Sequence, residues 1–181
     1  MSEQNSLFIQ IKITEEKLQQ FFRANPLPHV VDDNWLNWWN SRDMYQPRAL
    51  EHIPVYEKNN RAVINDWLNN RRMGCTENYE PASQTWTFSS VFFSENYTEI
   101  LPMLALLKDL ATYQDAGQEG FALVYNFYWG SDAVMAYLDF SNGEALLRNN
   151  VDMLLINPAI TETANRQIEA AAKALAKKFE N

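Results

Sequence analysis

The chain has 181 residues, 46% of them hydrophobic and 13% aromatic, and its net charge is −8. This composition supports one α+β domain over residues 1–181 with a sizeable core, and it excludes a disordered chain. A single cysteine, Cys75, excludes an internal disulfide framework, and the absence of a secretory signal or a long apolar run predicts a cytoplasmic protein without membrane contact.

The charge is concentrated in the middle of the sequence. Residues 81–160 hold nine acidic and two basic residues, whereas residues 1–80 hold eleven acidic and nine basic residues. The acidic stretch is also the most apolar and aromatic part of the chain. A folded surface of one sign repels nucleic acid and attracts basic proteins. We therefore predict a basic protein partner and no nucleic-acid partner.

The first predicted elements are a strand and a helix. Apolar residues alternate over residues 7–13, which indicates a strand with one buried face. Thr14 has the position of a helix cap, and Glu15 and Glu16 suit the positive end of the helix dipole. Pro26 ends this helix, whose apolar face is formed by Leu18, Phe21 and Phe22.

Two helices are predicted within a helical insertion near residues 26–75. The first has Asp33 or Asn34 as its cap and carries three tryptophans on one face, Trp35, Trp38 and Trp39. The second covers residues 60–72 and ends before Gly74. Tryptophans at this spacing most often pack in a core, and the alternative is that they anchor a partner. Trp39 is our candidate anchor.

The central third begins with residues 76–84, which are polar and are predicted to form a linker. A strand follows over residues 84–93, and alternation places on one side Trp86, Phe88, Ser90 and Phe92. A helix is predicted over residues 95–113. We expect Pro102 in its first turn, where a missing N–H group is tolerated.

The clearest pair of elements is an antiparallel hairpin. Residues 121–129 and 133–140 are rich in aromatic and β-branched residues, and Gly130-Ser131-Asp132 is typical of a tight turn. Alternation leaves about half of the hairpin's aromatic side chains exposed. An exposed aromatic sheet is typical of single-strand nucleic-acid binding, but that function also needs basic residues beside the rings, and this region is acidic.

The end of the chain is predicted to form a short helix over residues 143–150, a short strand over residues 151–156 and a final helix over residues 159–179. Strands and helices in this order, with an antiparallel hairpin, predict the α+β class. We expect a two-layer ferredoxin-like sandwich with an antiparallel sheet, into which the helical region near residues 26–75 is inserted.

Three stretches carry a resemblance to a known family. They read LFIQIKITEEKLQQFF, NWLNWWNSRDMY, and WTFSSVFFSENYTEILPMLALL followed by YQDAGQEGFALVYNFYWG. This pattern resembles the YubB-type ferredoxin-like domain, a bacterial family whose biochemical activity is generally unassigned. The family's tight Trp-Gly-Thr-Lys type of element is missing, because residues 38–42 read Trp-Trp-Asn-Ser-Arg. The resemblance implies a fold and no particular reaction.

The sequence contains no strong catalytic or cofactor motif. Five glycines form neither of the common phosphate-binding loops, and two histidines with one cysteine cannot build a standard zinc site. His29 with Asp32 and Asp33 could supply metal ligands, but these acids are also typical helix caps. We therefore predict no metal and no cofactor.

Two catalytic alternatives remain open at this point. Cys75 with His29 or His52 could form a nucleophile and base, although a lone cysteine is more often a small buried residue. Two acid pairs could serve in hydrolysis, although solvated surface acids are much commoner: Asp115 with Glu119, and Asp132 with Asp139. We name no catalytic residue and favour binding over catalysis.

These observations favour an acidic protein-binding domain. Its most concrete form is an immunity-type inhibitor that neutralises a basic bacterial toxin. The acids expected to steer the partner are Asp115, Glu119, Asp132 and Asp139, and the aromatic side chains expected to hold it are Tyr128, Trp129 and Trp39. The alternatives are a hydrolase with carboxylates in a surface cleft, and a structural or regulatory homodimer.

Overall fold

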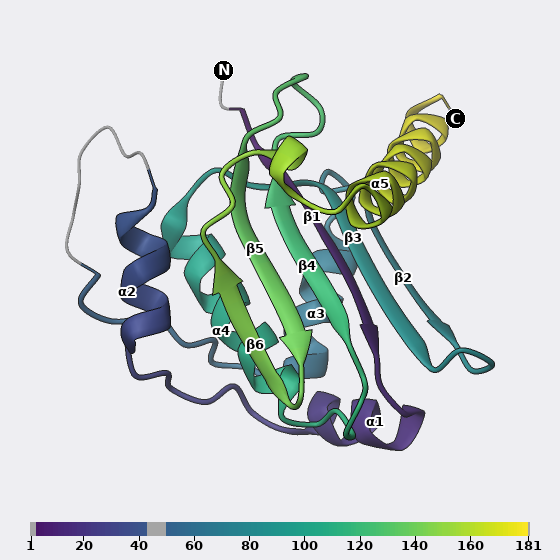
Figure 1. Cartoon of the computed structure of the whole chain (residues 1–181). Helices are drawn as coiled ribbons and strands as arrows, with labels where there is room; N and C mark the ends of the chain where they lie inside the picture. The colour runs from purple at the N-terminus through teal and green to yellow at the C-terminus, as the bar shows by residue number, and fades with distance from the viewer. Residues whose placement is uncertain (1–2, 43–49, 181) are drawn as a thin grey trace.

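A six-stranded antiparallel sheet forms the centre of the computed structural model, which describes residues 3–42 and 50–180 (Figure 1). Its strands are β1 (Asn5–Lys12), β2 (Cys75–Glu80), β3 (Thr85–Ser94), β4 (Gly120–Tyr125), β5 (Val134–Ser141) and β6 (Glu144–Arg148). They lie in the order β2-β3-β1-β4-β5-β6, and every neighbouring pair is antiparallel. The predicted mixture of helices with an antiparallel sheet is confirmed.

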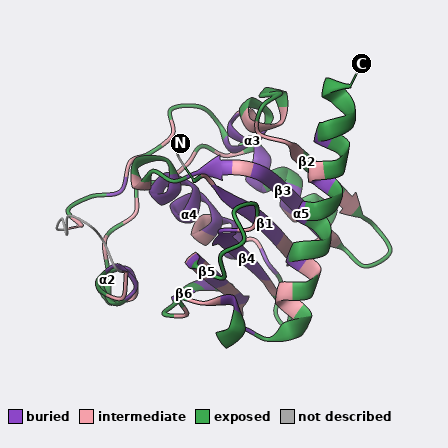
Figure 2. Ribbon diagram, turned by 90° about the horizontal axis from the view of Figure 1, so that it is seen from above, coloured by how far each residue is buried: buried purple, intermediate pink, exposed green. Residues whose placement is uncertain are grey.

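Helices cover both faces of this sheet. They are α1 (Glu15–Arg23), α2 (Asp33–Asn40), α3 (Asn60–Asn69), α4 (Tyr97–Ala111) and α5 (Pro158–Phe179), with a short 3₁₀ turn, η1 (Met153–Leu155). The first four helices share one hydrophobic core with the sheet, and α5 shares a second core with its opposite face (Figures 1 and 2). The described residues therefore form three layers, where two had been expected.

Alternating side chains of the strands build these two cores. On β1, Leu7, Ile9 and Ile11 face the four-helix side, whereas Phe8 faces α5. On β4, the α5 side receives Phe121, Leu123 and Tyr125. Because both faces are covered, the central strands are apolar on both sides, and Figure 2 shows them as the most buried part of the chain.

The helix starts follow local capping chemistry. Thr14 caps α1 as predicted, and its hydroxyl accepts a hydrogen bond from the Lys17 N–H group. The cap of α2 is Asp32, one residue before the predicted position. The predicted insertion contains α2 and α3, while residues 43–49, which include the end of the NWLNWWNSRDMY stretch, lie outside the described residues.

The prediction of a linker over residues 76–84 was wrong, because most of this stretch is strand β2. Its side chains alternate between half-buried and exposed positions, and Glu77 and Tyr79 are on the half-buried side. An edge strand needs only one weakly apolar face, and the sequence of β2 is therefore as polar as that of a typical loop.

Two predictions about β3 and α4 also need correction. The register between β1 and β3 shifts at the end of β3. This shift sends Phe93 into the four-helix core and Phe92 towards α5, so Phe92 does not share a side with Trp86. Pro102 is the sixth residue of α4 and is buried there, so it lies beyond the first turn.

The predicted β4–β5 hairpin exists with a longer connection. Both strands stop short of the predicted turn, which leaves residues 126–133 as a loop.

The stretch predicted as a helix over residues 143–150 is mainly strand β6, which a tight Asn142-Gly143 turn joins to β5. Both turn residues have positive φ angles, 53° and 75°, as this hairpin type requires. Residues 151–156 form one isolated bridge and η1 in place of the predicted strand.

Candidate protein-binding surfaces

One end of the sheet carries a group of exposed apolar side chains, here called the aromatic end: Tyr128, Trp129, Val151, Leu154 and Leu155. Their exposed fractions are 55%, 39%, 46%, 80% and 65%. Tyr128 and Trp129 come from the β4–β5 loop, and the other three come from the segment that leads from β6 to α5 (Figure 1). Exposed apolar groups gathered on one surface are typical of interaction sites.

Backbone hydrogen bonds hold the two segments of the aromatic end together. The Met153 N–H group donates to the Asp132 carbonyl at 2.8 Å, and the Val134 N–H group donates to the Val151 carbonyl at 2.9 Å. Ala133 also forms an isolated bridge with Asp152. The two segments are therefore joined where the β4–β5 loop enters β5, at the end of the sheet from which these apolar side chains project.

The two rings of the aromatic end, Tyr128 and Trp129, pack against neighbouring aromatic side chains. The Tyr128 ring lies edge-on to Phe92, with 4.9 Å between ring centroids, and Trp129 lies edge-on to Tyr128 at 5.4 Å. The Asn126 side chain accepts a hydrogen bond from the Trp129 N–H group. Rings that are positioned before binding lose little conformational freedom when a partner arrives.

The acids proposed to steer a partner do not form one surface. Asp132 is exposed in the β4–β5 loop, at the same end of the sheet as the aromatic end. Asp115 and Glu119 are exposed in the loop before β4, at the other end of that strand (Figure 1). The six residues of β4 separate the two ends by roughly 17 Å.

The structure gives Asp139 and Trp39 local partners. Asp139 on β5 forms an ion pair with Arg148 on β6, with 2.6 Å between the charged atoms, so its charge is largely balanced. The Trp39 side chain is only 8% exposed, and its ring packs edge-on against Tyr97. Its burial agrees with the core alternative for the tryptophan face and speaks against Trp39 as an anchor. Among the expected anchors, Tyr128 and Trp129 are exposed.

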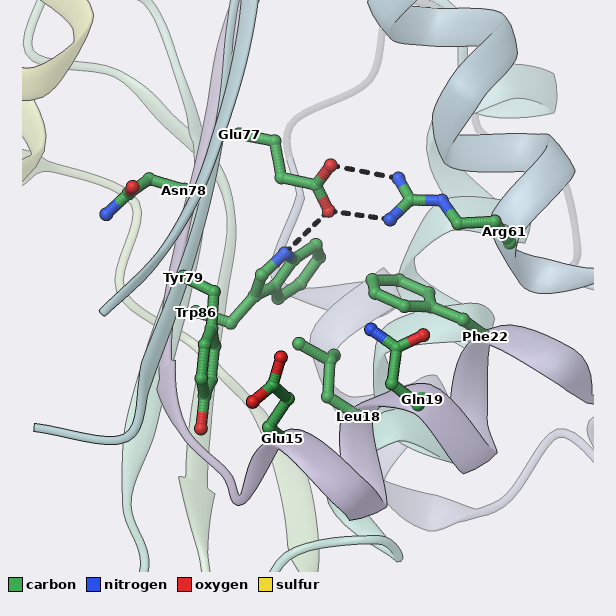
Figure 3. Close-up of a pocket in the computed structure, with 9 residues that line it drawn as sticks. All are labelled: Glu15, Leu18, Gln19, Phe22, Arg61, Glu77, Asn78, Tyr79 and Trp86. Atoms are coloured by element: carbon green, nitrogen blue, oxygen red, sulfur yellow. Dashed lines mark hydrogen bonds and ion pairs between the residues drawn. The ribbon is translucent and has the colours of Figure 1, made fainter. Parts of the chain in front are cut away.

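A second surface feature is a hollow of about 290 Å³ between the helices and the β2 edge, here called the edge hollow (Figure 3). The residues that line it belong to α1, α3, β2 and β3: Glu15, Leu18, Gln19, Phe22, Arg61, Glu77, Asn78, Tyr79 and Trp86. Leu18, Phe22 and Trp86 lie beneath it as buried core residues, so the surface that the hollow exposes is mainly polar.

One wall of the edge hollow is a closed hydrogen-bonded group. The Arg61 guanidinium donates to both carboxylate oxygens of Glu77 at 3.0 Å, and the Trp86 indole N–H group donates to one of them at 2.8 Å. The guanidinium carbon also lies 4.0 Å from the centroid of the Phe22 ring. Both oxygens of Glu77 are therefore occupied, which does not suit a proton-transfer role.

Glu15 has a different position in the edge hollow. It is exposed in the first turn of α1 and points towards the hollow beside Tyr79 (Figure 3). Burial raises the pKa of Tyr79, and the nearby negative charge of Glu15 raises it further. Among the described residues Glu15 takes part in no ion pair, so its carboxylate faces the mouth of the hollow with its charge unbalanced.

Cys75, His29 and the Asp132–Asp139 pair do not have the geometry of catalytic groups. Burial raises the pKa of the Cys75 thiol to about 11, which leaves it protonated and weakly nucleophilic at neutral pH. The His29 Nε2 atom lies 2.8 Å from the Asp109 carboxylate. Asp132 and Asp139 are separated by most of β5, roughly 20 Å, which is too far for a glycosidase-type acid pair.

Within residues 3–42 and 50–180, no group of three or more His, Cys, Asp and Glu side chains is placed to hold a metal ion. Over the same ranges, no helix is both long and apolar enough to cross a membrane.

Several residues of these surfaces were missed from the sequence. Val151, Leu154 and Leu155 had been assigned to a short strand, whereas the structure places them in an irregular segment with the turn η1. The residues of the edge hollow come from three separated stretches of the chain. The one available signal was the two-residue spacing of Glu77 and Tyr79, which places both side chains on the same face of a strand.

Comparison with known proteins adds no relative to this description: no family model, no curated protein and no solved structure matches the chain. No residue role is therefore transferred from a relative. The roles proposed for these surfaces rest on their exposure, geometry and charge.

Proposed function

We propose that this chain is a protein-binding domain that holds a basic partner through the aromatic end. The observation that carries the proposal is the exposure of five apolar side chains on two segments that backbone hydrogen bonds join. Tyr128 and Trp129 provide the rigid aromatic contacts that dominate many interfaces. Leu154 and Leu155 extend the apolar area beside them.

The charge of the chain supports a basic partner over an acidic one. The net charge is −8, and Asp132 lies at the same end of the sheet as the aromatic end. A nearby exposed acid increases the rate at which a basic partner arrives and adds less to the final affinity. Asp115 lies at the opposite end of β4 and contributes only through the overall field.

The apolar contacts are tested by capture of partners on the tagged protein at low and high salt. Leu154→Ser removes an 80% exposed side chain from the aromatic end, and Val30→Ser removes an 86% exposed side chain elsewhere. We expect a basic protein to be retained by the original chain and by Val30→Ser, and to be bound about tenfold more weakly by Leu154→Ser. High salt should weaken its capture.

The result that contradicts the proposal is equal capture by Leu154→Ser and Val30→Ser. A partner that is acidic, or one whose capture does not depend on salt, contradicts the proposed charge complementarity. If the chain captures only itself through the aromatic end, the homodimer alternative replaces the proposal.

The steering role of Asp132 has its own matched pair of variants. Asp132→Lys reverses a charge at the same end of the sheet as the aromatic end, and Asp115→Lys reverses a charge at the other end of the sheet. We expect Asp132→Lys to slow association several-fold more than Asp115→Lys, with similar dissociation rates. Equal association rates for the two variants would remove Asp132 from the steering role.

The most specific form of the proposal is an immunity-type inhibitor that acts in the cytoplasm on a basic bacterial toxin. It is supported by the acidic charge and by the single cysteine, which suits a reducing compartment. We also propose that β1-α1-β2-β3-α4-β4 is a ferredoxin-like unit, as the YubB-type resemblance implies. The succession of these elements supports this relation. A toxin-like gene next to the gene for this chain would support the inhibitor role.

A further inference from the structure

The two outer strands of the sheet differ in what covers their free edges. At β6, the Asn34 side chain bonds both backbone groups of Leu147: its Nδ2 atom donates to the carbonyl, and its Oδ1 atom accepts from the N–H group, each at 3.0 Å. Asn34 thus occupies the place of a further strand. Among the described residues, only β3 pairs with β2, and no strand lies on its outer side (Figure 1).

The edge hollow lies directly beside this open strand. Glu77 and Tyr79 turn towards the hollow, whereas Asn78 points away from it (Figure 3). Asn78 therefore borders the hollow through its backbone, as the alternation of a strand requires. An extended segment that pairs with β2 would turn every second side chain to the face of the sheet on which the hollow lies, and one of these side chains could enter the hollow.

We propose that β2 and the edge hollow form a second binding surface, which takes an extended segment of a partner protein and holds one lysine or arginine side chain of that segment in the hollow. The backbone of the segment pairs with β2. The basic side chain enters the hollow beside Gln19 and Tyr79, and its charged group reaches Glu15 at the mouth. This surface is distinct from the aromatic end and can exist without it.

The charge of the hollow determines this choice of occupant. Its lining includes two acids, Glu15 and Glu77, and one base, Arg61, which is already paired with Glu77. The remaining charge is that of Glu15, which attracts a cation and repels an acidic side chain. A second copy of the chain is disfavoured, because its β2 would bring further glutamates, including Glu80, to the same edge.

The size of the hollow also suits a single side chain. Its volume of about 290 Å³ lies at the lower limit for small-molecule sites. A lysine or arginine side chain is long and flexible enough to lie along this polar lining and bring its charged end to Glu15 at the mouth. Recognition by edge pairing with one side-chain pocket follows the general pattern of extended-peptide binding.

The test is selection of binders from a phage-displayed library of random decapeptides on the whole protein. Selected peptides should share a lysine or arginine within an extended, alternating sequence. When such a peptide is added to isotope-labelled protein, the backbone amide signals of Cys75–Glu80 should shift. Replacing its arginine by citrulline, which keeps the shape and removes the charge, should weaken binding about fivefold.

A matched pair of variants on α1 completes the test. Glu15→Gln and Glu16→Gln change two exposed acids in the same helical turn, and only Glu15 lines the hollow. We expect Glu15→Gln to weaken the selected peptide about fivefold and Glu16→Gln to have less than a twofold effect.

Three results would overturn the proposal: no enrichment of peptides with a basic residue, selected peptides whose signals map away from β2, or equal effects of the two variants. Protection of the β2 amides by a dimer of this chain would assign the edge to a second copy and would also overturn it. These results concern β2 and the edge hollow, whereas Leu154→Ser and Val30→Ser test the aromatic end separately, so a failure here is distinguishable from a failure of the proposed function.

Discussion

The two edge strands solve the same problem in different ways. At β6, the amide of Asn34 replaces a missing strand, and its Oδ1 atom also accepts a hydrogen bond from Lys108 at 2.7 Å. At β2, the edge has a polar, acidic sequence and a hollow beside it. An unpaired strand edge invites association unless it is covered or made polar. The difference is that an added side chain covers the edge of β6, whereas the polar edge of β2 has no covering strand among the described residues, and the proposed peptide site depends on that open edge.

The comparison first depends on β2 being held firmly against β3. Burial raises the pKa of the Cys75 thiol at the start of β2 from 9.0 to about 11. At pH 8, the native thiol should therefore react with iodoacetamide about 100-fold more slowly than the thiol of the unfolded chain. A native rate equal to the unfolded rate would show that this end of β2 is frayed.

The same pKa shift predicts how stability depends on pH. A raised native pKa means that the folded chain binds the thiol proton more tightly than the unfolded chain. The stabilisation is therefore fully present below pH 9 and is lost as the pH rises from 9 to 11. Cys75→Ser should flatten this part of the stability curve in urea unfolding measurements. If the curves of both proteins have the same slope there, the thiol is not buried.

The next largest effect is expected from opening the β6 edge. Asn34→Ala removes three hydrogen bonds, and of the two hydrogen bonds of the Lys108 ammonium group it leaves the one to the Ala145 carbonyl. We expect the free energy of unfolding to fall by about 2–3 kcal/mol in urea unfolding. Asn37→Ala changes an exposed residue of the same helix and should alter it by less than about 0.5 kcal/mol. Equal effects of the two variants would remove Asn34 from its proposed covering role.

A smaller effect is expected at the wall of the edge hollow. Arg61→Met leaves the Glu77 carboxylate with only the Trp86 indole as a partner. Because this ion pair is partly exposed, we expect a loss of about 1–2 kcal/mol in the free energy of unfolding. Lys58→Met removes the more exposed pair with Asp66 and should change it by less than about 0.5 kcal/mol. A similar effect for both variants would mean that the wall adds no stability.

The sequence predicted elements where local chemistry and periodicity agree. The first strand, the helix capped by Thr14, and the final helix opened by Asn157 and Pro158 were all found close to their predicted positions. Each combines a clear apolar period with a cap or a stop. The final helix packs Ala164 and Ile168 against the sheet, but the sequence could not tell which face of the sheet it would cover.

The elements that were missed depend on contacts that are distant in the sequence. Strand β2 has too little apolar character to be recognised, and it is a strand because β3 pairs with it. Strand β6 could have been found, because Asn142-Gly143 is a strong hairpin signal that an apparent helical pattern obscured. The shift at the end of β3 moves Phe92 to the other face, and no single-strand pattern predicts such a shift.

The candidate sites were predicted in part. The exposure of Tyr128 and Trp129 agrees with the expectation that some hairpin aromatics face solvent, and the burial of Trp39 agrees with the core alternative. The acidic stretch was treated as one surface, but β4 separates Asp115 from Asp132. Charge that is contiguous in the sequence is divided when a strand runs through it, and only the fold reveals the division.

The measurement that tests the central claim most directly is photo-crosslinking from the aromatic end in cells that produce the protein. A photoreactive amino acid is placed at Leu154, and a matched control carries it at Val30, which is similarly exposed. The proposed function predicts one heavier adduct that contains a basic protein and that forms only from position 154. No adduct from position 154, or the same adducts from both positions, would contradict the claim that this surface binds a basic partner.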